Sequence, residues 1–261
     1  MNLHFYKYQG TGNDFVIFDN RQNVFKKDTK LIKHICHRRF GVGADGLILL
    51  ETSANENLDF KMVYYNADGR ESTMCGNGGR CIVAFAKHLE IINSTAKFEA
   101  IDGLHKAEIN GDSVNLLMAD VPLINTGRSA TFLDTGSPHH IEFVDNLEDF
   151  DVKKQGRRIR HLENYETIGG VNVNFVRFTD DVLKVRTYER GVEDETYSCG
   201  TGVTAAAIAA KMSGFVSEIP VKVSTKGGNL EVDFELLPPN GCQNIWLKGP
   251  ATFVFEGEIS C

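Results

Sequence analysis

The sequence has no dense block of lysine and arginine and no stripe of stacking aromatics; it contains a single tryptophan. Its formal net charge is −7. Non-specific nucleic-acid binding needs concentrated positive charge, so the sequence predicts no nucleic-acid partner. The densest basic run, residues 153–160, includes Gln155 and Gly156, and its charge predicts a solvated loop.

Long apolar runs and a disulfide framework are also missing. No run approaches the roughly 18 apolar residues of a membrane helix, and the first ten residues lack the basic-then-apolar order of a signal peptide. Six cysteines in 261 residues do not have the density of a secreted disulfide scaffold. The only close pair, Cys75 and Cys81, does not have zinc-ribbon spacing. We therefore expect a cytoplasmic protein with reduced thiols and no membrane contact.

A hidden repeat runs through the chain. Residues 62–88 and 184–212 both read as a strand, a turn with glycine (Gly69, Gly191), a short polar strand, Cys-Gly-x-Gly and an apolar stretch of helical length. In the second copy, residues 203–210 are small and apolar nearly all round, which predicts a buried helix.

The repeat continues after the helices. Residues 97–110 and 221–234 both alternate as strands do and are interrupted by glycine, as in a hairpin. The order predicts an α+β fold of two pseudo-symmetric halves. Each half is a mostly antiparallel sheet or barrel around a central buried helix. We place the N-terminal half at 1–118, with the C-terminal strand 250–261, and the C-terminal half at 119–249. The active site is expected at their interface.

Two cysteines stand out by their place in the repeat. A lone cysteine is usually a small buried apolar residue, and four of the six are assigned to that class: Cys36, Cys81, Cys242 and Cys261. Cys75 and Cys199 instead precede Gly-x-Gly at a predicted helix start. Unpaired N–H groups and the helix dipole stabilise a thiolate there, and the glycines let an anion approach the backbone amides.

Such a pair suits the inversion of a stereocentre. One thiolate removes the α-proton and the opposite thiol returns one, and the roles exchange in the reverse direction. Helix-end N–H groups can stabilise charge developing on the substrate carboxylate. No lysine stands in a recognisable pyridoxal-phosphate context. The adjacent pair His139 and His140 would point to opposite sides of a strand, so we expect neither a cofactor nor a metal.

At these positions the sequence resembles the diaminopimelate epimerase family. The motifs are GTGNDF (10–15), YNADGRESTMCGNGGRC (65–81), VN (171–172), YERG (188–191) and SCGTG (198–202), and the resemblance covers essentially the whole chain. It implies a homodimer of two-half subunits without a cofactor. It also implies interconversion of LL- and meso-2,6-diaminopimelate on the route to lysine and peptidoglycan precursors.

The resemblance assigns roles to individual residues. Cys75 and Cys199 match the catalytic thiols. Glu189 matches the residue that accepts the distal ammonium of the substrate. Four residues match those whose backbone N–H groups hold the carboxylate at the reacting carbon: Gly76, Asn77, Gly200 and Thr201. Four others match side chains that hold the distal carboxylate or frame the pocket: Asn13, Asn66, Asn172 and Arg190.

Three positions depart from the family pattern. Ser137 stands where the family has asparagine in Gly-Asn-Pro-His, so a hydroxyl replaces an amide that would contact the distal carboxylate. Gly46 stands where some members carry a side chain that reaches the substrate, and Arg70 replaces a usual serine. The departures bear on how the distal end of the substrate is recognised, not on the thiol chemistry.

Other readings of the same residues stay open. A racemase or isomerase of the same fold would take a different substrate, although Glu189 and Arg190 favour one with a second charged amino-acid end. A dithiol redox protein would use Cys75 and Cys199 as a disulfide. A non-catalytic amino-acid-binding protein would need the carboxylate clamp but not the thiols.

Overall fold

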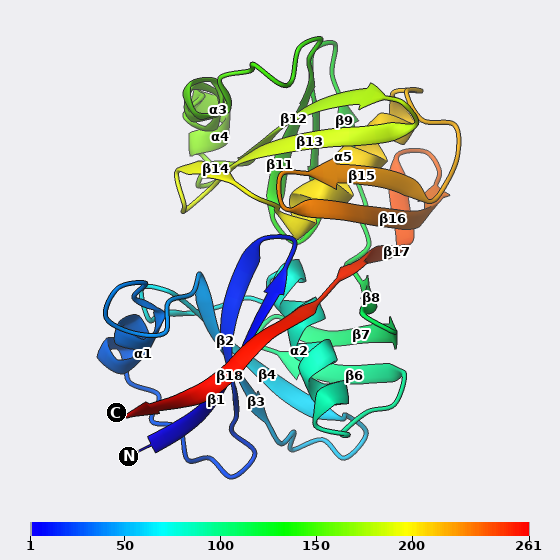
Figure 1. Cartoon of the computed structure of the whole chain (residues 1–261). Coiled ribbons are helices and arrows are strands. Elements are labelled where there is room, and N and C mark those ends of the chain that lie inside the picture. The colour runs from blue at the N-terminus through cyan, green and yellow to red at the C-terminus, as the bar shows by residue number, and fades with distance from the viewer. Residues whose placement is uncertain (1, 261) are drawn as a thin grey trace. The chain divides into compact units, whose positions relative to one another are not determined.

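The computed structural model describes residues 2–260, so Cys261 lies outside the described residues. The chain divides into two compact units. Unit 1 comprises Met1–Leu116 with Gly249–Cys261, and unit 2 comprises Leu117–Lys248 (Figure 1).

Unit 1 is built on a sheet whose strands run in the order β18–β1–β2–β3–β4–β6–β7–β8, with the short β5 also on β4. Figure 1 shows β18, in red, beside β1, in dark blue. The pairs β2–β3 and β4–β6 are parallel and the others antiparallel. The strands are β1 (Asn2–Gly10), β2 (Asn13–Asp19), β3 (Gly46–Glu51), β4 (Phe60–Asn66), β5 (Glu71–Ser72), β6 (Thr95–Ala100), β7 (Gly103–Asn110), β8 (Ser113–Leu117) and β18 (Thr252–Ser260).

Unit 2 repeats this order as β9–β10–β11–β12–β13–β15–β16–β17, with β14 on β13. Its parallel pairs, β11–β12 and β13–β15, occupy the corresponding places. The strands are β9 (Ile124–Thr126), β10 (Thr131–Asp134), β11 (Pro138–Phe143), β12 (Asn172–Thr179), β13 (Val182–Glu189), β14 (Asp194–Thr196), β15 (Val221–Thr225), β16 (Gly228–Leu237) and β17 (Gly241–Pro250). The predicted α+β fold of two related halves is confirmed.

Each parallel pair is joined by a helical crossover, because parallel neighbours cannot be linked by a tight turn. The central crossovers are α2 (Gly76–His88) and α5 (Gly200–Met212). Helix α5 is buried from Gly202 to Ala210, so its small apolar residues let the sheet close around it, as the composition predicts. Gly69 and Gly191 adopt positive φ, of 87° and 91°, in the turns that precede the two helices.

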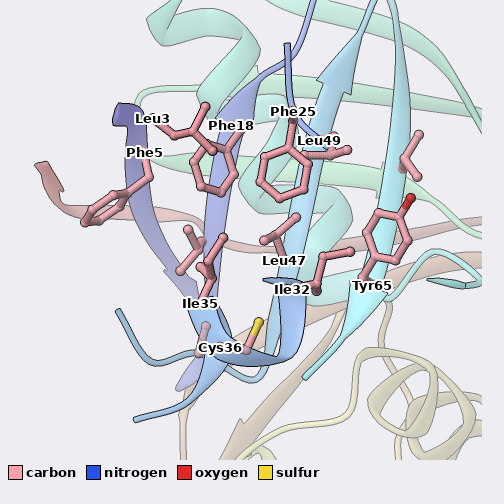
Figure 2. Close-up of a cluster of buried hydrophobic side chains, with 13 residues drawn as sticks. Leu3, Phe5, Phe18, Phe25, Ile32, Ile35, Cys36, Leu47, Leu49 and Tyr65 are labelled. Carbon is pink, nitrogen blue, oxygen red and sulfur yellow. The ribbon is translucent and has the colours of Figure 1, made fainter. Parts of the chain in front are cut away.

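The outer crossover of unit 1, between β2 and β3, contains α1 (Thr29–Cys36). This helix packs on a cluster of buried hydrophobic side chains. The carboxylate of Asp28 accepts hydrogen bonds from the first N–H groups of the helix and fixes its start. Ile32 and Ile35 then point at side chains of β2 and β3, including Phe18 and Leu47 (Figure 2). This packing covers the face of the sheet opposite to α2.

The prediction of a solvated loop at residues 153–160 is wrong. The corresponding crossover of unit 2 begins there with α3 (Val152–Arg160), followed by the short α4 (Glu163–Glu166). Asp151 caps α3, and Val152, Gly156 and Ile159 form a buried stripe at helical spacing. At Gly156 a Cβ would lie 2.3 Å from the Cβ of Tyr188, so glycine allows the helix to pack on β13. The charged residues cover only the outward face.

Candidate active site

Both predicted catalytic cysteines stand at the start of a central helix. Cys75 is the N-cap residue of α2 and Cys199 that of α5, and both have extended backbone. Neither side chain caps its helix, so the first N–H groups keep their capacity to bind an anion. Burial raises the pKa of the three other cysteines of the described chain, to about 12 for Cys36 and Cys81 and to about 11 for Cys242. Those three thiols stay protonated at neutral pH.

In unit 1, Asn13 lies beside Cys75. Its Oδ1 accepts hydrogen bonds from the Cys75 thiol (3.5 Å) and from Nδ2 of Asn77 (3.3 Å). The orientation of the Asn13 amide is fixed from behind, because its Nδ2 donates to Oδ2 of Asp45 at 2.8 Å. The structure thus brings three predicted site residues together at one helix start, and sequence reasoning gave Asp45 no role.

Asp45 belongs to a charged cluster that supports this arrangement. Arg38 donates to both carboxylate oxygens of Asp14, at 3.0 and 2.7 Å, and to Asp45 at 2.6 Å. Lys7 forms a second ion pair with Asp14 at 2.7 Å. Burial alone would raise the pKa of Asp14, but the hydrogen bonds from Arg38 and Lys7 outweigh it and hold the pKa well below its usual range. Asp14 therefore stays charged, and its pairing with Arg38 holds Asp45 where it orients Asn13.

A fully buried arginine lies behind the start of α2. Arg80 is 0% exposed and donates to Oδ1 of Asn77 (3.0 Å), Oγ1 of Thr11 (3.2 Å) and the carbonyls of Gly76 and Pro250. Burial lowers its pKa. Within residues 2–260 no carboxylate pairs with this guanidinium, so its positive charge adds to the helix dipole at the first turn. Sequence reasoning quoted Arg80 in its motif without a role.

Asn66 and Gly46 are linked through one ring. The hydroxyl of Tyr64 donates to Oδ1 of Asn66 at 2.9 Å, at the exposed end of β4. A Cβ on Gly46 would lie 2.5 Å from Cε2 of Tyr64. Glycine at position 46, one of the departures, is therefore required by the ring that orients Asn66.

In unit 2, the start of α5 carries Cys199, Gly200 and Thr201. Oγ1 of Thr201 lies 3.4 Å from the Cys199 sulfur, and the Thr201 carbonyl accepts a hydrogen bond from Thr135 at 2.9 Å. Thr135 matches Thr11 of unit 1, which contacts Asn77, and the two residues of each pair are 66 positions apart. Both threonines precede a glycine with positive φ. This short Thr-Gly repeat was available in the sequence and was missed.

The other predicted residues of unit 2 gather at the ends of β12 and β13. Oδ1 of Asn172 accepts the backbone N–H of Arg190 at 2.9 Å, and its Nδ2 donates to Oγ of Ser137 at 2.8 Å. Arg190 is half-buried, and its Nη1 donates to the Gly170 carbonyl at 3.3 Å. Glu189, also half-buried, is the last residue of β13. An acid and an arginine so placed provide both signs of charge for an amino-acid head group.

Within residues 2–260, no three histidine, cysteine or acidic side chains gather in a way that could hold a metal ion. Within the same residues, no helix has the length and apolar character needed to cross a membrane.

Solved structures share the fold at low sequence identity. A PhzF-family phenazine biosynthesis protein of Bacillus anthracis aligns over 100% of both chains with a TM-score of 0.78 and 13% identity. A hydroxyproline epimerase from Agrobacterium vitis aligns over 99% of this chain and 92% of its own with a TM-score of 0.74 and 14% identity. These likenesses establish the architecture alone.

Sequence comparison identifies the family. The family model described as diaminopimelate epimerase matches residues 5–124 and 131–254. A diaminopimelate epimerase of Flavobacterium psychrophilum is 55% identical, covering 98% of this chain and 100% of its own. One of Chlorobaculum tepidum is 47% identical, covering 96% and 99%. The resemblance and the expectation of an isomerase of the epimerase type are confirmed: the chain belongs to the diaminopimelate epimerase family.

Proposed function

We propose that this protein interconverts LL- and meso-diaminopimelate, with Cys75 and Cys199 acting on opposite faces of one α-carbon. The observation that carries the proposal is the repeated helix start: each thiol sits at an N-cap, is followed by glycine and does not occupy its helix's N–H groups. Relatives that match nearly the whole chain carry the name of this activity.

The reaction conserves protons and needs no redox partner. One cysteine, as thiolate, removes the α-proton and becomes a thiol, and the C–H electron pair remains on carbon. The other cysteine, as thiol, delivers its proton to the opposite face and becomes a thiolate. The product leaves with inverted configuration, and the enzyme is ready for the reverse direction.

Backbone N–H groups at the two helix starts stabilise the intermediate. Gly76, Asn77, Gly200 and Thr201 offer these donors to the carboxylate on the reacting carbon, where negative charge accumulates. Because the donors are fixed by the helices before the substrate arrives, little reorganisation is required as the charge develops.

The unreacting end of the substrate is held by residues of both signs. Arg190 binds the distal carboxylate and Glu189 binds the distal ammonium. The side-chain amides of Asn66 and Asn172 complete the hydrogen bonds of these two substrate groups. Asn13 frames the pocket beside Cys75. An amino-acid head group needs this combination, whereas a proline-type substrate has no second charged end.

We also propose the cofactor independence, cellular location, oligomeric state and metabolic role of the enzyme. The enzyme works without pyridoxal phosphate, as a cytoplasmic homodimer, and supplies meso-diaminopimelate for lysine and peptidoglycan precursors. The support for these statements is the family membership.

Proton NMR in D₂O tests the proposal. Reduced protein without added cofactor is mixed with LL-diaminopimelate, and loss of the α-proton signal together with appearance of the meso isomer is expected. No exchange by folded, reduced protein would reject diaminopimelate as the substrate. Exchange that required pyridoxal phosphate would reject the thiol mechanism.

A further inference from the structure

The turn that carries Glu189 and Arg190 is closed by a carboxylate of its own. Glu189 ends β13 and pairs with Asp194 of β14, so the residues between them form the turn. The backbone N–H of Glu193 donates to the Glu189 carbonyl at 2.9 Å. The side chain of Glu193 folds back over the turn, where its Oε1 accepts the N–H of Gly191 at 2.9 Å. Both proposed head-group residues therefore lie on a turn that Glu193 shapes.

The backbone of Glu193 has a conformation that a side chain disfavours. Its φ is 60°, in the left-handed region, where the Cβ of an L-residue crowds the backbone. The carboxylate offsets this cost, because it also accepts the hydroxyl of Tyr188 at 3.1 Å and Nε of Arg160 at 2.6 Å. Burial alone would raise the pKa of Glu193, but the hydrogen bonds from Gly191, Arg160 and Tyr188 outweigh it and lower the pKa. The carboxylate is therefore charged at neutral pH.

Arg160 brings the end of a distant helix to this turn. It is the last residue of α3, 33 positions before Glu193, and its side chain is 16% exposed. Its Nη1 also donates to the Gly169 carbonyl at 3.4 Å. A Cβ on Gly170 would lie 1.5 Å from this Nη1, so glycine leaves the space in which the guanidinium lies. Arg160 therefore joins the turn at Glu193 to the loop that precedes β12.

The same loop is contacted by Arg190. Its Nη1 donates to the Gly170 carbonyl at 3.3 Å, and its backbone N–H donates to Oδ1 of Asn172. Two arginines from different elements thus donate to consecutive carbonyls of one loop. The place of the Arg190 guanidinium depends on both the turn and the loop, and the ion pair between Arg160 and Glu193 connects these two segments.

We propose that Arg160 and Glu193 are positioning residues that hold the Arg190 guanidinium where it binds the distal carboxylate of the substrate. The inference rests on the proposed function. An isolated ion pair at a surface contributes little, but this carboxylate also satisfies a backbone N–H and supports an unfavourable φ. Loss of either partner frees the turn from the loop. The substrate must then order Arg190 as it binds, and this ordering weakens binding.

Hydrogen exchange tests the turn without substrate. By NMR, the Gly191 N–H is expected to exchange at least about tenfold faster in Glu193→Ala than in the wild type, because its acceptor is lost. Arg160→Ala should also accelerate this exchange, because the carboxylate is no longer held over the turn. The matched control is Lys153→Ala, which removes an ion pair with Asp194 between the same helix and the same hairpin and should change nothing. Unchanged exchange in Glu193→Ala or in Arg160→Ala would overturn the inference, whatever the substrate proves to be.

Kinetics test the effect on the substrate. Glu193→Ala and Arg160→Ala should each raise KM for diaminopimelate about tenfold, with kcat within about threefold of wild type, because the thiols are untouched. In the double variant KM should stay about tenfold above wild type, since both substitutions break one connection. Lys153→Ala should keep the wild-type KM. A wild-type KM in either single variant, or effects that multiply to about a hundredfold, would overturn the inference, whereas an inactive wild type would overturn the proposed function instead.

A second substitution of Glu193 separates the effect of the carboxylate from that of the backbone. Glu193→Gly removes the carboxylate but adopts a φ of 60° without strain. We expect its KM to match that of Glu193→Ala at an unchanged far-ultraviolet circular dichroism spectrum. A KM near wild type in Glu193→Gly would show that the carboxylate and Arg160 do not position Arg190.

Discussion

The helix starts at Cys75 and Cys199 share one backbone plan but differ in the side chains behind it. In both units a threonine before a positive-φ glycine contacts the second residue of the helix. In both units, a side chain at the start of the strand before the outer crossover is hydrogen-bonded to a side chain at the start of the strand after it. These pairs are Asn13 with Asp45, and Ser137 with Asn172. The duplicated part is the helix start that carries each cysteine.

The two helix starts differ in the charge of the side chains around them. Five residues after Cys75 stands the buried Arg80, and five after Cys199 stands Thr204, whose hydroxyl only returns a hydrogen bond to the Gly200 carbonyl. Behind Asn13 lies the ionised cluster of unit 1, whereas behind Ser137 lies a neutral histidine. A repeated scaffold can therefore hold the same residue twice in different electrostatic settings. Four sets of variants test how far this holds.

The largest effect is expected where the halves are alike. Cys75→Ala and Cys199→Ala should each lower kcat for epimerisation by at least about a thousandfold, because each removes an acid–base group that the other cannot replace. Cys242→Ala, which removes a buried thiol of unit 2, is the control and should stay within about tenfold of wild type. Substantial turnover by either Cys75→Ala or Cys199→Ala would contradict the proposed two-base mechanism.

The next effect separates the halves. Arg80→Ala should lower the free energy of unfolding by about 3 kcal/mol, because it leaves a cavity and orphans the acceptors on Asn77, Thr11 and Pro250. Thr204→Ala, the matched change in α5, should cost less than about 1 kcal/mol, since alanine favours the helix. Urea unfolding followed by far-ultraviolet circular dichroism measures both. Equal losses would show that Arg80 is no more embedded than Thr204.

A third comparison uses the second glycine of each Cys-Gly-x-Gly. At Gly202 a Cβ would lie 2.4 Å from Oδ1 of the buried Asn174, so Gly202→Ala must displace that amide and should cost about 1–3 kcal/mol. At Gly78 a Cβ would meet only the ends of Ile48, Phe15 and Met62 side chains, at 3.3–3.5 Å. Gly78→Ala should therefore stay within about 1 kcal/mol of wild type, because improved helix propensity offsets the tighter contact. Similar unfolding curves for the two variants would contradict this difference.

The sequence allowed some of these features to be predicted and hid others for physical reasons. The Cys-Gly-x-Gly repeat and the alanine-rich stretch marked the central helices, because capping position and small-residue periodicity are local. The sequence predicts a loop in place of α3 because the high charge density of residues 153–160 obscures the helical spacing of the buried Val152, Gly156 and Ile159. The burial of Arg80 and the hydrogen bonding of Ser137 depend on residues distant in sequence, such as Pro250 and Asn172. Such long-range hydrogen bonds leave no local pattern.

The smallest effect concerns pH and the neutral side of the comparison. His139 stays neutral in the folded protein because burial lowers its pKa to about 3, whereas in the unfolded chain it gains a proton near pH 6.5. The stability associated with the neutral ring is therefore complete above about pH 6.5 and is lost as the pH falls toward 3. The loss should reach about 1 kcal/mol by pH 5.5. Urea titrations followed by fluorescence of Trp246, the single tryptophan and a residue of unit 2, measure this dependence.

The control is His139→Gln, which removes the titrating group. The free energy of unfolding of this variant should fall less steeply over the same pH range, because all other titrating groups are the same in both proteins. Parallel curves for the wild type and His139→Gln would mean that the histidine is not held neutral, and the electrostatic contrast between the two helix starts would lose its support in unit 2.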